Sequence, residues 1–428
     1  MTTPSYYAHG LRRMVGRSRD ENHRAATPLE LLFDLTFVAA FGIAGNELAH
    51  GIAEAHYGGA ITGFLFAMFA IVWAWVNYSW FASAFDTDDW LYRVLTMVQM
   101  AGVIVLAIGL PRMFASIIEG AVVDNSIMVA GYVVMRVALI GQWLRAARGN
   151  PQYRVVAKSY ALLVGIAQVA WVMVVILPLD LTGFLIAALI AGVLDIGAPI
   201  IAEEKGRRHG GMTPWNAHHI AERYGLLAII ALGETVLGTL AAARVLTDTE
   251  GWSISSIMVI GLGIVITFAL WWSYFLIPSA HILAVRRSKA FPWGYGHFFV
   301  FTSIAAIGAG LHVIGYVYDE HYHVSTVVAI ASIALPVLTY SLSLYLLHAW
   351  LVSAFAKNPV LQISALALPV VAIVMAMVGW PLWACLLLVT LSPVTVVVSF
   401  ESGAWRTLDA QVDKAIRQAT AVAATNKD

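Results

Sequence analysis

Two acidic residues, Glu30 and Asp34, lie four positions apart inside one apolar run. Residues at that spacing share one face of an α-helix, so both carboxyl groups would meet the same neighbour. Inside a membrane, such a pair can hold a cation or accept protons in turn. Alternatively, Glu30 is a first-turn acid that complements the helix N-terminus, and Asp34 pairs with an arginine. The sequence leaves both interpretations open.

A second group of charges begins another apolar run, where Glu222 and Arg223 are adjacent. One interpretation is a structural ion pair in the first helical turn. The other joins Glu222 and Arg223 to Glu30 and Asp34 in a site that handles an ion or a proton. This second interpretation requires the two runs to approach each other at the same depth.

Two further charges, Arg136 and Glu234, lie deeper inside apolar runs. An unpaired charge at such a position costs several kcal/mol. We therefore predict that Arg136 and Glu234 form a buried charge pair. The pair would act as a gate or a proton-linked switch, or it would only fix the register of two helices.

The histidines and the single cysteine show no metal-binding pattern. His218 and His219 are adjacent, so their side chains point to different helix faces. Cys385 alone excludes a disulfide framework and a cysteine-based cluster. The chain also lacks a Gly-rich phosphate loop, a nucleophile elbow and a His-Glu-x-x-His motif. We therefore assign no metal site and no catalytic residue, and any cofactor stays unknown.

The segments that hold these charges are apolar enough to lie in a membrane. The 428 residues are 60% hydrophobic and only 12% charged, against about 25% charged in soluble domains. A membrane-spanning helix needs roughly 20 mainly apolar residues. Twelve such runs are present: 28–50, 60–83, 91–110, 126–144, 153–177, 181–202, 218–241, 253–277, 295–317, 324–349, 360–379 and 380–400. The sequence predicts an all-α, polytopic membrane protein with about 12 transmembrane helices in contact with the lipid bilayer.

The charges predict how the chain crosses the bilayer. Its 25 basic and 25 acidic residues balance, so nothing favours binding to a nucleic acid. With the N-terminus inside, nearly all Lys and Arg residues fall on the inside, and only Arg112 and Arg244 fall outside. An excess of Lys and Arg is typical of the cytoplasmic loops of membrane proteins. Both termini are therefore predicted to be cytoplasmic.

The two halves of the chain resemble each other. Tyr92 precedes Tyr295 by 203 residues, and Arg145 precedes His348 by the same 203 residues. We predict two parallel six-helix repeats, 28–202 and 218–400, joined by a cytoplasmic loop at 203–217. Such repeats are related by an axis along the membrane normal. A basic tail at 1–27 and an amphipathic tail at 401–428 complete the chain.

Two motifs resemble the signature of the bacterial low-temperature-requirement protein A family. They are Glu30-Leu-Leu-Phe-Asp-Leu-Thr-Phe-Val38, and Glu222-Arg-Tyr-Gly-Leu226 followed by Leu232-Gly-Glu234. The resemblance covers essentially all of 28–400 and implies a multi-pass protein of the bacterial inner membrane, linked by name to growth in the cold. It supplies no reaction and no ligand. It also marks Phe33, Gly225 and Gly233 as motif positions.

Three functions are compatible with these features. A carrier or channel would move a cation, a proton or a small solute at a site between the repeats, and this is the function we favour. A non-catalytic scaffold or sensor is the first alternative, because both tails could meet partners or anionic lipid. An enzyme that modifies a lipid within the membrane is the second. Neither a single copy nor an oligomer is excluded.

Overall fold

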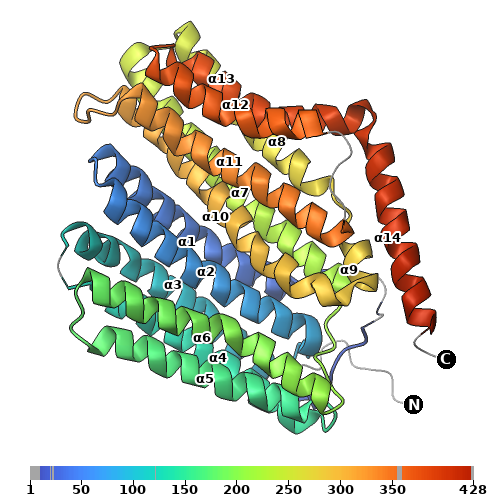
Figure 1. Ribbon diagram of the computed structural model, residues 1–428. Coiled ribbons are helices and arrows are strands. Elements are labelled where there is room, and N and C mark those ends of the chain that lie inside the picture. Colours follow the sequence, from blue (N-terminus) through green and yellow to red (C-terminus); the bar gives the residue numbers. More distant parts are fainter. Residues whose placement is uncertain (1–9, 20, 22–23, 121, 354–358, 426–428) are drawn as a thin grey trace. The chain divides into compact units, whose positions relative to one another are not determined.

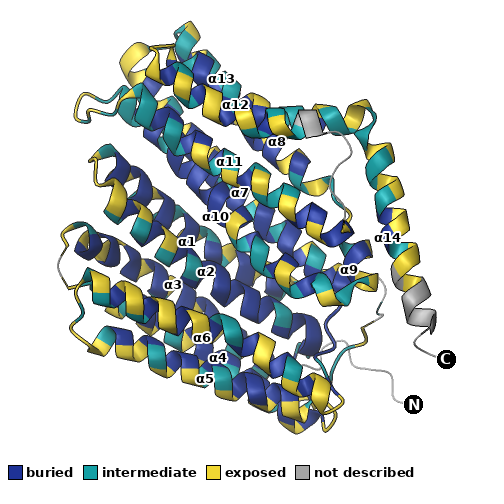
Figure 2. Cartoon of the chain, in the orientation of Figure 1, coloured by how far each residue is buried: buried dark blue, intermediate teal, exposed yellow. Residues whose placement is uncertain are grey.

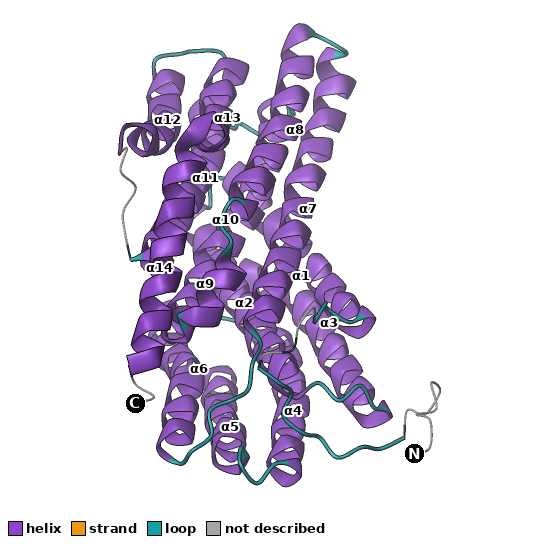
Figure 3. Cartoon of the chain, turned by 90° about the vertical axis from the view of Figure 1, so that its right-hand side faces the viewer, coloured by secondary structure: helices purple, strands orange, loops and turns teal. Residues whose placement is uncertain are grey.

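The computed structural model describes residues 10–425 except 20, 22–23, 121 and 354–358, and their regular structure is entirely helical (Figure 3). The α-helices are α1 (Pro28–Ala53), α2 (Tyr57–Phe85), α3 (Trp90–Ile118), α4 (Ser126–Gly149), α5 (Arg154–Ile176), α6 (Leu181–Arg208), α7 (Ala217–Glu250), α8 (Ile254–Phe275), α9 (Ser279–Val285), α10 (Ala290–Val317), α11 (Thr326–Val352), α12 (Pro359–Met377), α13 (Leu382–Ser399) and α14 (Trp405–Thr425). A 3₁₀ turn, η1 (Arg287–Lys289), precedes α10, and a π-helical segment, η2 (Phe400–Ala404), joins α13 to α14.

Among the described residues, eleven helical stretches are long and apolar enough to cross a membrane. They correspond to eleven of the twelve predicted spans. The remaining span, 360–379, is α12, whose stretch Gln362–Met377 is apolar but shorter. The all-α, polytopic class is therefore confirmed, and eleven spans meet the length that crossing requires. Helix α6 also continues to Arg208, into the segment predicted as a loop at 203–217.

Short polar residues set where several helices begin. Asp89, Asp180, Ser253 and Ser325 precede α3, α6, α8 and α11, and each side chain accepts a hydrogen bond from an amide three residues later. These bonds satisfy amides that have no partner within the first helical turn. The caps explain why apolar runs become helices with defined starting points.

The chain forms two compact units. Unit 1 contains residues 1–40 and 70–220, and unit 2 contains residues 41–69 and 221–428. The boundary between the units crosses α1 after residue 40 and α2 before residue 70. The first part of α1 and the last part of α2 therefore belong to unit 1, and the turn that joins these two helices belongs to unit 2. The predicted division into 28–202 and 218–400 follows whole helices instead. The two-repeat arrangement stays a prediction.

In unit 1, α3 packs on α4, α4 on α5, and α5 on α6 (Figure 1). Glycines allow the closest approach, because a Cβ on Gly109 would lie 2.3 Å from the Met128 amide nitrogen. Small residues at such contacts are typical of membrane helices. Many residues of α5 and α6 are exposed (Figure 2). They include the apolar residues Leu162, Val169, Leu189 and Val193. Exposed apolar side chains of this kind suit a lipid environment.

In unit 2, α10 packs on α11, α11 on α12, and α13 contacts both α12 and α8. Every residue from 300 to 311 of α10 is buried. Beyond α13, Gly403 in η2 has φ 127°, a backbone conformation that favours glycine. The chain turns there, and α14 runs in a new direction (Figure 1). The described part of the predicted amphipathic tail is therefore a separate helix.

Candidate functional site

The N-terminus of α1 is closed by a reciprocal cap between Thr27 and Glu30. The Thr27 amide donates to Oε2 of Glu30 over 2.8 Å, and the Glu30 amide donates to Oγ1 of Thr27 over 3.3 Å. This arrangement is a capping box, which satisfies two amides at once. Oε2 of Glu30 is therefore part of the cap that begins α1.

The same carboxyl group meets a histidine at the start of α7. Nε2 of His219 lies within hydrogen-bond distance of Oε2 of Glu30, at 3.3 Å, and 3.2 Å from Oε1, and both side chains are fully buried. The position of His219 is set by Asn216, whose Oδ1 accepts a hydrogen bond from the His219 amide over 3.0 Å. A buried carboxyl group beside an imidazole can share or exchange one proton.

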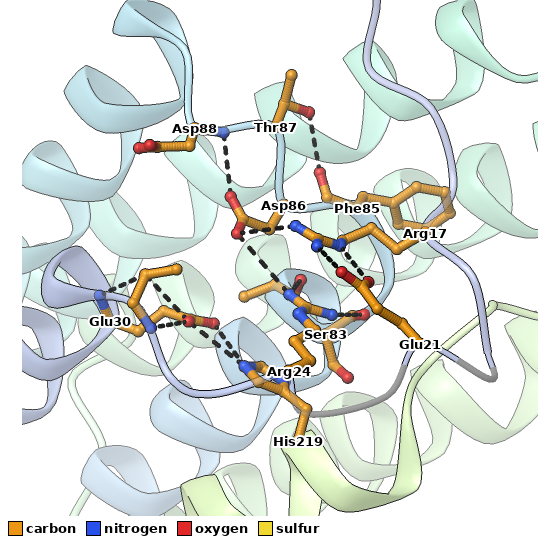
Figure 4. A network of polar contacts seen from close by, with 12 residues as sticks. Arg17, Glu21, Arg24, Glu30, Ser83, Phe85, Asp86, Thr87, Asp88 and His219 are labelled. Carbon is orange, nitrogen blue, oxygen red and sulfur yellow. Dashed lines mark hydrogen bonds and ion pairs between the residues drawn. The ribbon is translucent and has the colours of Figure 1, made fainter. Parts of the chain in front are cut away.

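Next to this pair, an arginine covers the C-terminal end of α2 (Figure 4). Arg24 donates to the carbonyl oxygens of Ala82, over 2.8 Å, and of Ser83. A cation at this position bonds to carbonyl oxygens of the last helical turn and complements the helix dipole. Burial lowers the pKa of Arg24 below its ordinary value, and the negative charge of Glu30 opposes that effect.

Asp86, directly after α2, connects the same cluster to the N-terminal segment (Figure 4). Its Oδ2 lies 3.8 Å from Arg24 and 3.6 Å from Arg17. Burial and the neighbouring charge of Glu30 raise the pKa of Asp86 to about 6, against the opposing effect of the two arginines. The cluster thus contains an acid that changes charge close to physiological pH.

Asp34 lies one helical turn beyond Glu30 and is fully buried. Its Oδ1 accepts a hydrogen bond from Nε1 of Trp75 in α2 over 2.7 Å. The adjacent motif residue Phe33 packs on Tyr78, with ring centroids 3.8 Å apart. The motif in α1 therefore places a charged residue and an aromatic residue against the same neighbouring helix.

A third group of charges in unit 1 joins α3 to α4. Asp89 forms an ion pair with Arg145 and also accepts hydrogen bonds from the amides of Arg12 and Tyr92. Burial alone would raise the pKa of Asp89, but the bonds from Arg145 and the two amides outweigh it and lower the pKa to about 2. This aspartate is fixed as an anion, in contrast to Asp86.

Arg136 forms an ion pair with a carboxylate of unit 1. Its Nη2 lies 3.5 Å from Oδ2 of Asp195 in α6, and the hydroxyl group of Tyr132 contacts both side chains. Trp171 donates a further hydrogen bond to the same oxygen over 3.2 Å. Asp195 therefore supplies a carboxylate that balances Arg136. The Arg136–Glu234 pair stays a prediction.

In unit 2, Glu234 of α7 is buried with 7% of its surface exposed. A Cβ on Gly42 of α1 would lie 3.4 Å from its Oε1, and a Cβ on Gly308 of α10 would lie 2.6 Å from its backbone. Gly42 therefore leaves space for the carboxyl group, and Gly308 allows α10 to approach the backbone of α7 closely. Among the described residues, no ion pair involves Glu234, and its Oε1 accepts no hydrogen bond.

The other motif positions of α7 have different environments. Arg223 is fully buried, whereas Glu222 is exposed. Gly225 is closely packed, since a Cβ there would lie 3.0 Å from the ring of Phe275, but Gly233 has open space around it. The grouping of Glu222 and Arg223 with Glu30 and Asp34 stays a prediction.

Several residues of these clusters were not among the predicted site residues. His219 had a usable signal, because it precedes Arg223 by four positions, the same spacing that links Glu30 to Asp34. Asp86 and Arg24 gave no such signal, since both lie outside the apolar runs. Among the residues that the structure describes, no group of three or more His, Cys, Asp or Glu side chains is arranged to hold a metal ion.

These features define a polytopic helical membrane protein with charged groups buried among its helices. The chain belongs to the bacterial low temperature requirement A protein (LtrA) family, whose model matches residues 25–398. This match confirms the resemblance carried by the motifs in α1 and α7.

The chain is also similar to the uncharacterized protein RA0937 of Rhizobium meliloti (strain 1021). The two are 26% identical over 283 residues, which cover 63% of this chain and 61% of that protein. The chain thus spans about three fifths of the length of the curated relative that it matches. No solved structure gives a significant match.

Proposed function

We propose that this LtrA-family protein moves a proton or a small cation across the bacterial inner membrane. The observation that carries the proposal is Glu234, a buried carboxyl group that has no ion pair among the described residues. A charged carboxylate without a partner is strongly disfavoured inside a membrane protein. Glu234 is therefore expected to hold either a proton or a bound cation.

The cluster at the start of α1 is the second part of the proposed pathway. Glu30 and His219 are within reach of a shared proton, and Asp34 lies one turn further along α1. Arg223 is the buried basic residue of the second motif, and Glu222 is its exposed neighbour. In the proposed orientation, with both termini cytoplasmic, these residues receive the ion or proton at the cytoplasmic side.

Flux measurements on the purified full-length chain in proteoliposomes test the proposal. A pH gradient or a membrane potential is imposed, and entry of protons, Na⁺ and K⁺ is followed with ion-sensitive dyes. We expect at least one of these ions to enter faster than in protein-free vesicles. Glu234→Gln keeps the size of the side chain and replaces its ionisable carboxyl group with a neutral amide, so it should abolish that flux.

Glu250→Gln is the matched control, because Glu250 lies on the same helix but is exposed at its end. It should transport as the wild type does. If none of the three ions enters above the protein-free rate, or if Glu234→Gln transports normally, the proposal is wrong. Each variant is first shown to elute as the wild type does in size-exclusion chromatography.

A further inference from the structure

Unit 2 contains a cavity of about 420 Å³. It is lined by residues from α8, α11, α12, α13, η2 and α14. Its volume lies in the range of small-molecule sites in proteins, roughly 300–1,000 Å³. None of the residues of the two LtrA motifs lines it, so the cavity is separate from the proposed ion-handling groups.

The chemistry of the walls restricts what the cavity accepts. The apolar part includes Leu344, Leu366 and Val396, and the polar part is made of hydroxyl, amide and imidazole groups. No Asp, Glu, Lys or Arg lines the cavity. A charged ligand would find no counter-charge there, whereas a ligand with an apolar body and an uncharged polar head would match both kinds of wall.

Several of the polar side chains that line the cavity already have a hydrogen-bond partner within the protein. The Tyr340 hydroxyl donates to the carbonyl oxygen of Leu270 over 2.6 Å, and the Ser402 hydroxyl donates to that of Ser399 over 3.1 Å. His348 differs from them. Its side chain is 7% exposed, and neither Nδ1 nor Nε2 has a hydrogen-bond partner.

An unsatisfied imidazole is unusual, because most buried polar groups in proteins have a hydrogen-bond partner. His348 lines the cavity, so a ligand there can supply the missing partner. A neutral imidazole offers one donor and one acceptor. A hydroxyl group also donates and accepts, and it therefore complements His348 without adding charge.

The C-terminal helix indicates where the ligand comes from. Thr407, Leu408 and Gln411 of α14 form part of the wall. Amphipathic helices of this kind lie at the membrane interface, with the apolar face toward the acyl chains. We therefore infer that a cavity lined by such a helix lies where lipid head groups meet acyl chains, and that its ligand comes from the surrounding bilayer.

We propose that this cavity binds an uncharged, single-chain membrane amphiphile with a hydroxylated head, such as a monoacylglycerol. The head lies at His348, where a hydroxyl group bonds to the imidazole. The acyl chain follows the apolar wall formed by Leu344, Leu366 and Val396. The ligand thereby contacts α14 and holds this helix against the rest of unit 2.

Photocrosslinking of the purified full-length chain tests this proposal. The probe is a monoacylglycerol with a diazirine in its acyl chain, and labelled peptides are located by mass spectrometry. We expect labelling on α11, α13 and α14 that unlabelled monoacylglycerol removes. A free fatty acid of the same chain length, which is charged, should compete at least about tenfold less well, because its carboxylate finds no counter-charge.

Two variants address the cavity in different ways. His348→Leu removes the hydrogen bond and should weaken labelling about tenfold, and Leu344→Trp should fill the cavity and remove labelling. His312→Leu is the matched control, because His312 lies on α10 and does not line the cavity. It should label as the wild type does.

Three outcomes would overturn the proposal. Labelling that excess monoacylglycerol does not remove means that the probe reacts non-specifically and that the cavity has no site for it. Equal competition by the fatty acid means that an uncharged head is not required. Unchanged labelling of both His348→Leu and Leu344→Trp, with folding confirmed by thermal unfolding, means that the probe binds elsewhere.

Discussion

Arg136 and Asp195 are buried together, with 1% and 0% of their side chains exposed. Removing one member of such a pair leaves a buried charge and costs about 3–5 kcal/mol, whereas replacing both by apolar residues is often neutral. We expect Arg136→Met and Asp195→Leu each to lower the thermal stability strongly, and the double variant to lower it less than either. A double-mutant cycle, measured by thermal unfolding in detergent, gives the coupling energy.

The same cycle with Glu234→Gln is the control. Because Asp195 already balances Arg136, the losses from Arg136→Met and Glu234→Gln should add. Strong coupling between Arg136 and Glu234, with none between Arg136 and Asp195, would instead support the pair that the sequence analysis predicted.

The charge of Asp89 should make stability depend on pH in the acid range. Its pKa of about 2 in the folded chain lies below its ordinary value of 3.8. The charged form therefore stabilises the fold at every pH above 3.8, and this stabilisation is lost as the pH falls through 2. At pH 7 the contribution is about 2 kcal/mol. Asp89→Asn removes the charge but keeps a good N-cap.

We expect the melting temperature of Asp89→Asn to be lower than that of the wild type at pH 7, and the two to converge between pH 4 and pH 2. Asp180→Asn is the comparison, since Asp180 caps α6 without an ion pair in the described part of the chain. Its melting temperature should stay close to that of the wild type. Equal melting temperatures of Asp89→Asn and wild type at pH 7 would contradict the assignment.

The described part of the N-terminal segment is a structural element rather than a loose basic tail. Arg13 donates to the carbonyl oxygen of Gly149, the last residue of α4, over 2.7 Å. Asn150 binds the same segment, through the Gly16 amide over 2.8 Å and the Met14 carbonyl over 2.8 Å. Like Arg24 on α2, Arg13 satisfies a helix C-terminus. These arginines therefore have a role other than attraction to anionic lipid.

Gly149 allows this contact, since a Cβ there would lie 1.9 Å from the Met14 carbonyl oxygen. We expect Gly149→Ala to displace the segment and to destabilise unit 1 by about 1–3 kcal/mol. Trypsin should then cleave at Arg13 and Arg17 faster than in the wild type. Thermal unfolding and limited proteolysis measure the two effects.

Gly141→Ala on the same helix is the control, because a Cβ there would approach other atoms no closer than 4.0 Å. It should leave the cleavage rate unchanged and should raise stability by up to about 1 kcal/mol, as expected for alanine in a helix. Equal cleavage rates and equal stabilities of Gly149→Ala and Gly141→Ala would contradict the proposed role of Gly149.

At the scale of the whole molecule, the predicted orientation can be tested with cysteines placed at Ser18 and Glu320. Both residues are exposed, and Glu320 lies in the loop between α10 and α11. In a Cys385→Ser background, an impermeant thiol reagent added outside intact cells should label Glu320→Cys only. Ser18→Cys should react only after the cells are opened. Labelling of both from the same side would contradict the orientation.

The sequence by itself determined the class of the protein and much of its helical architecture. The apolar length of each run is a local property, so eleven helices that can span a membrane follow from composition alone. Residues such as Asp89, Ser253 and Ser325 mark helix starts for an equally local reason, because a cap acts within one turn. The run at 360–379 is equally apolar, but the helix there, α12, is shorter.

Only the tertiary structure decided which charges meet. The sequence required a carboxylate for Arg136, but the balance of charge could not choose between Asp195 and Glu234, because partners on different helices are selected by packing and depth. Glu30 shows the same limit. Its bonds to Thr27 are local and predictable, whereas its contact with His219 depends on how the start of α7 packs in unit 1. The cavity beside His348 has no sequence signature at all, because it is the space that six separate elements leave unfilled.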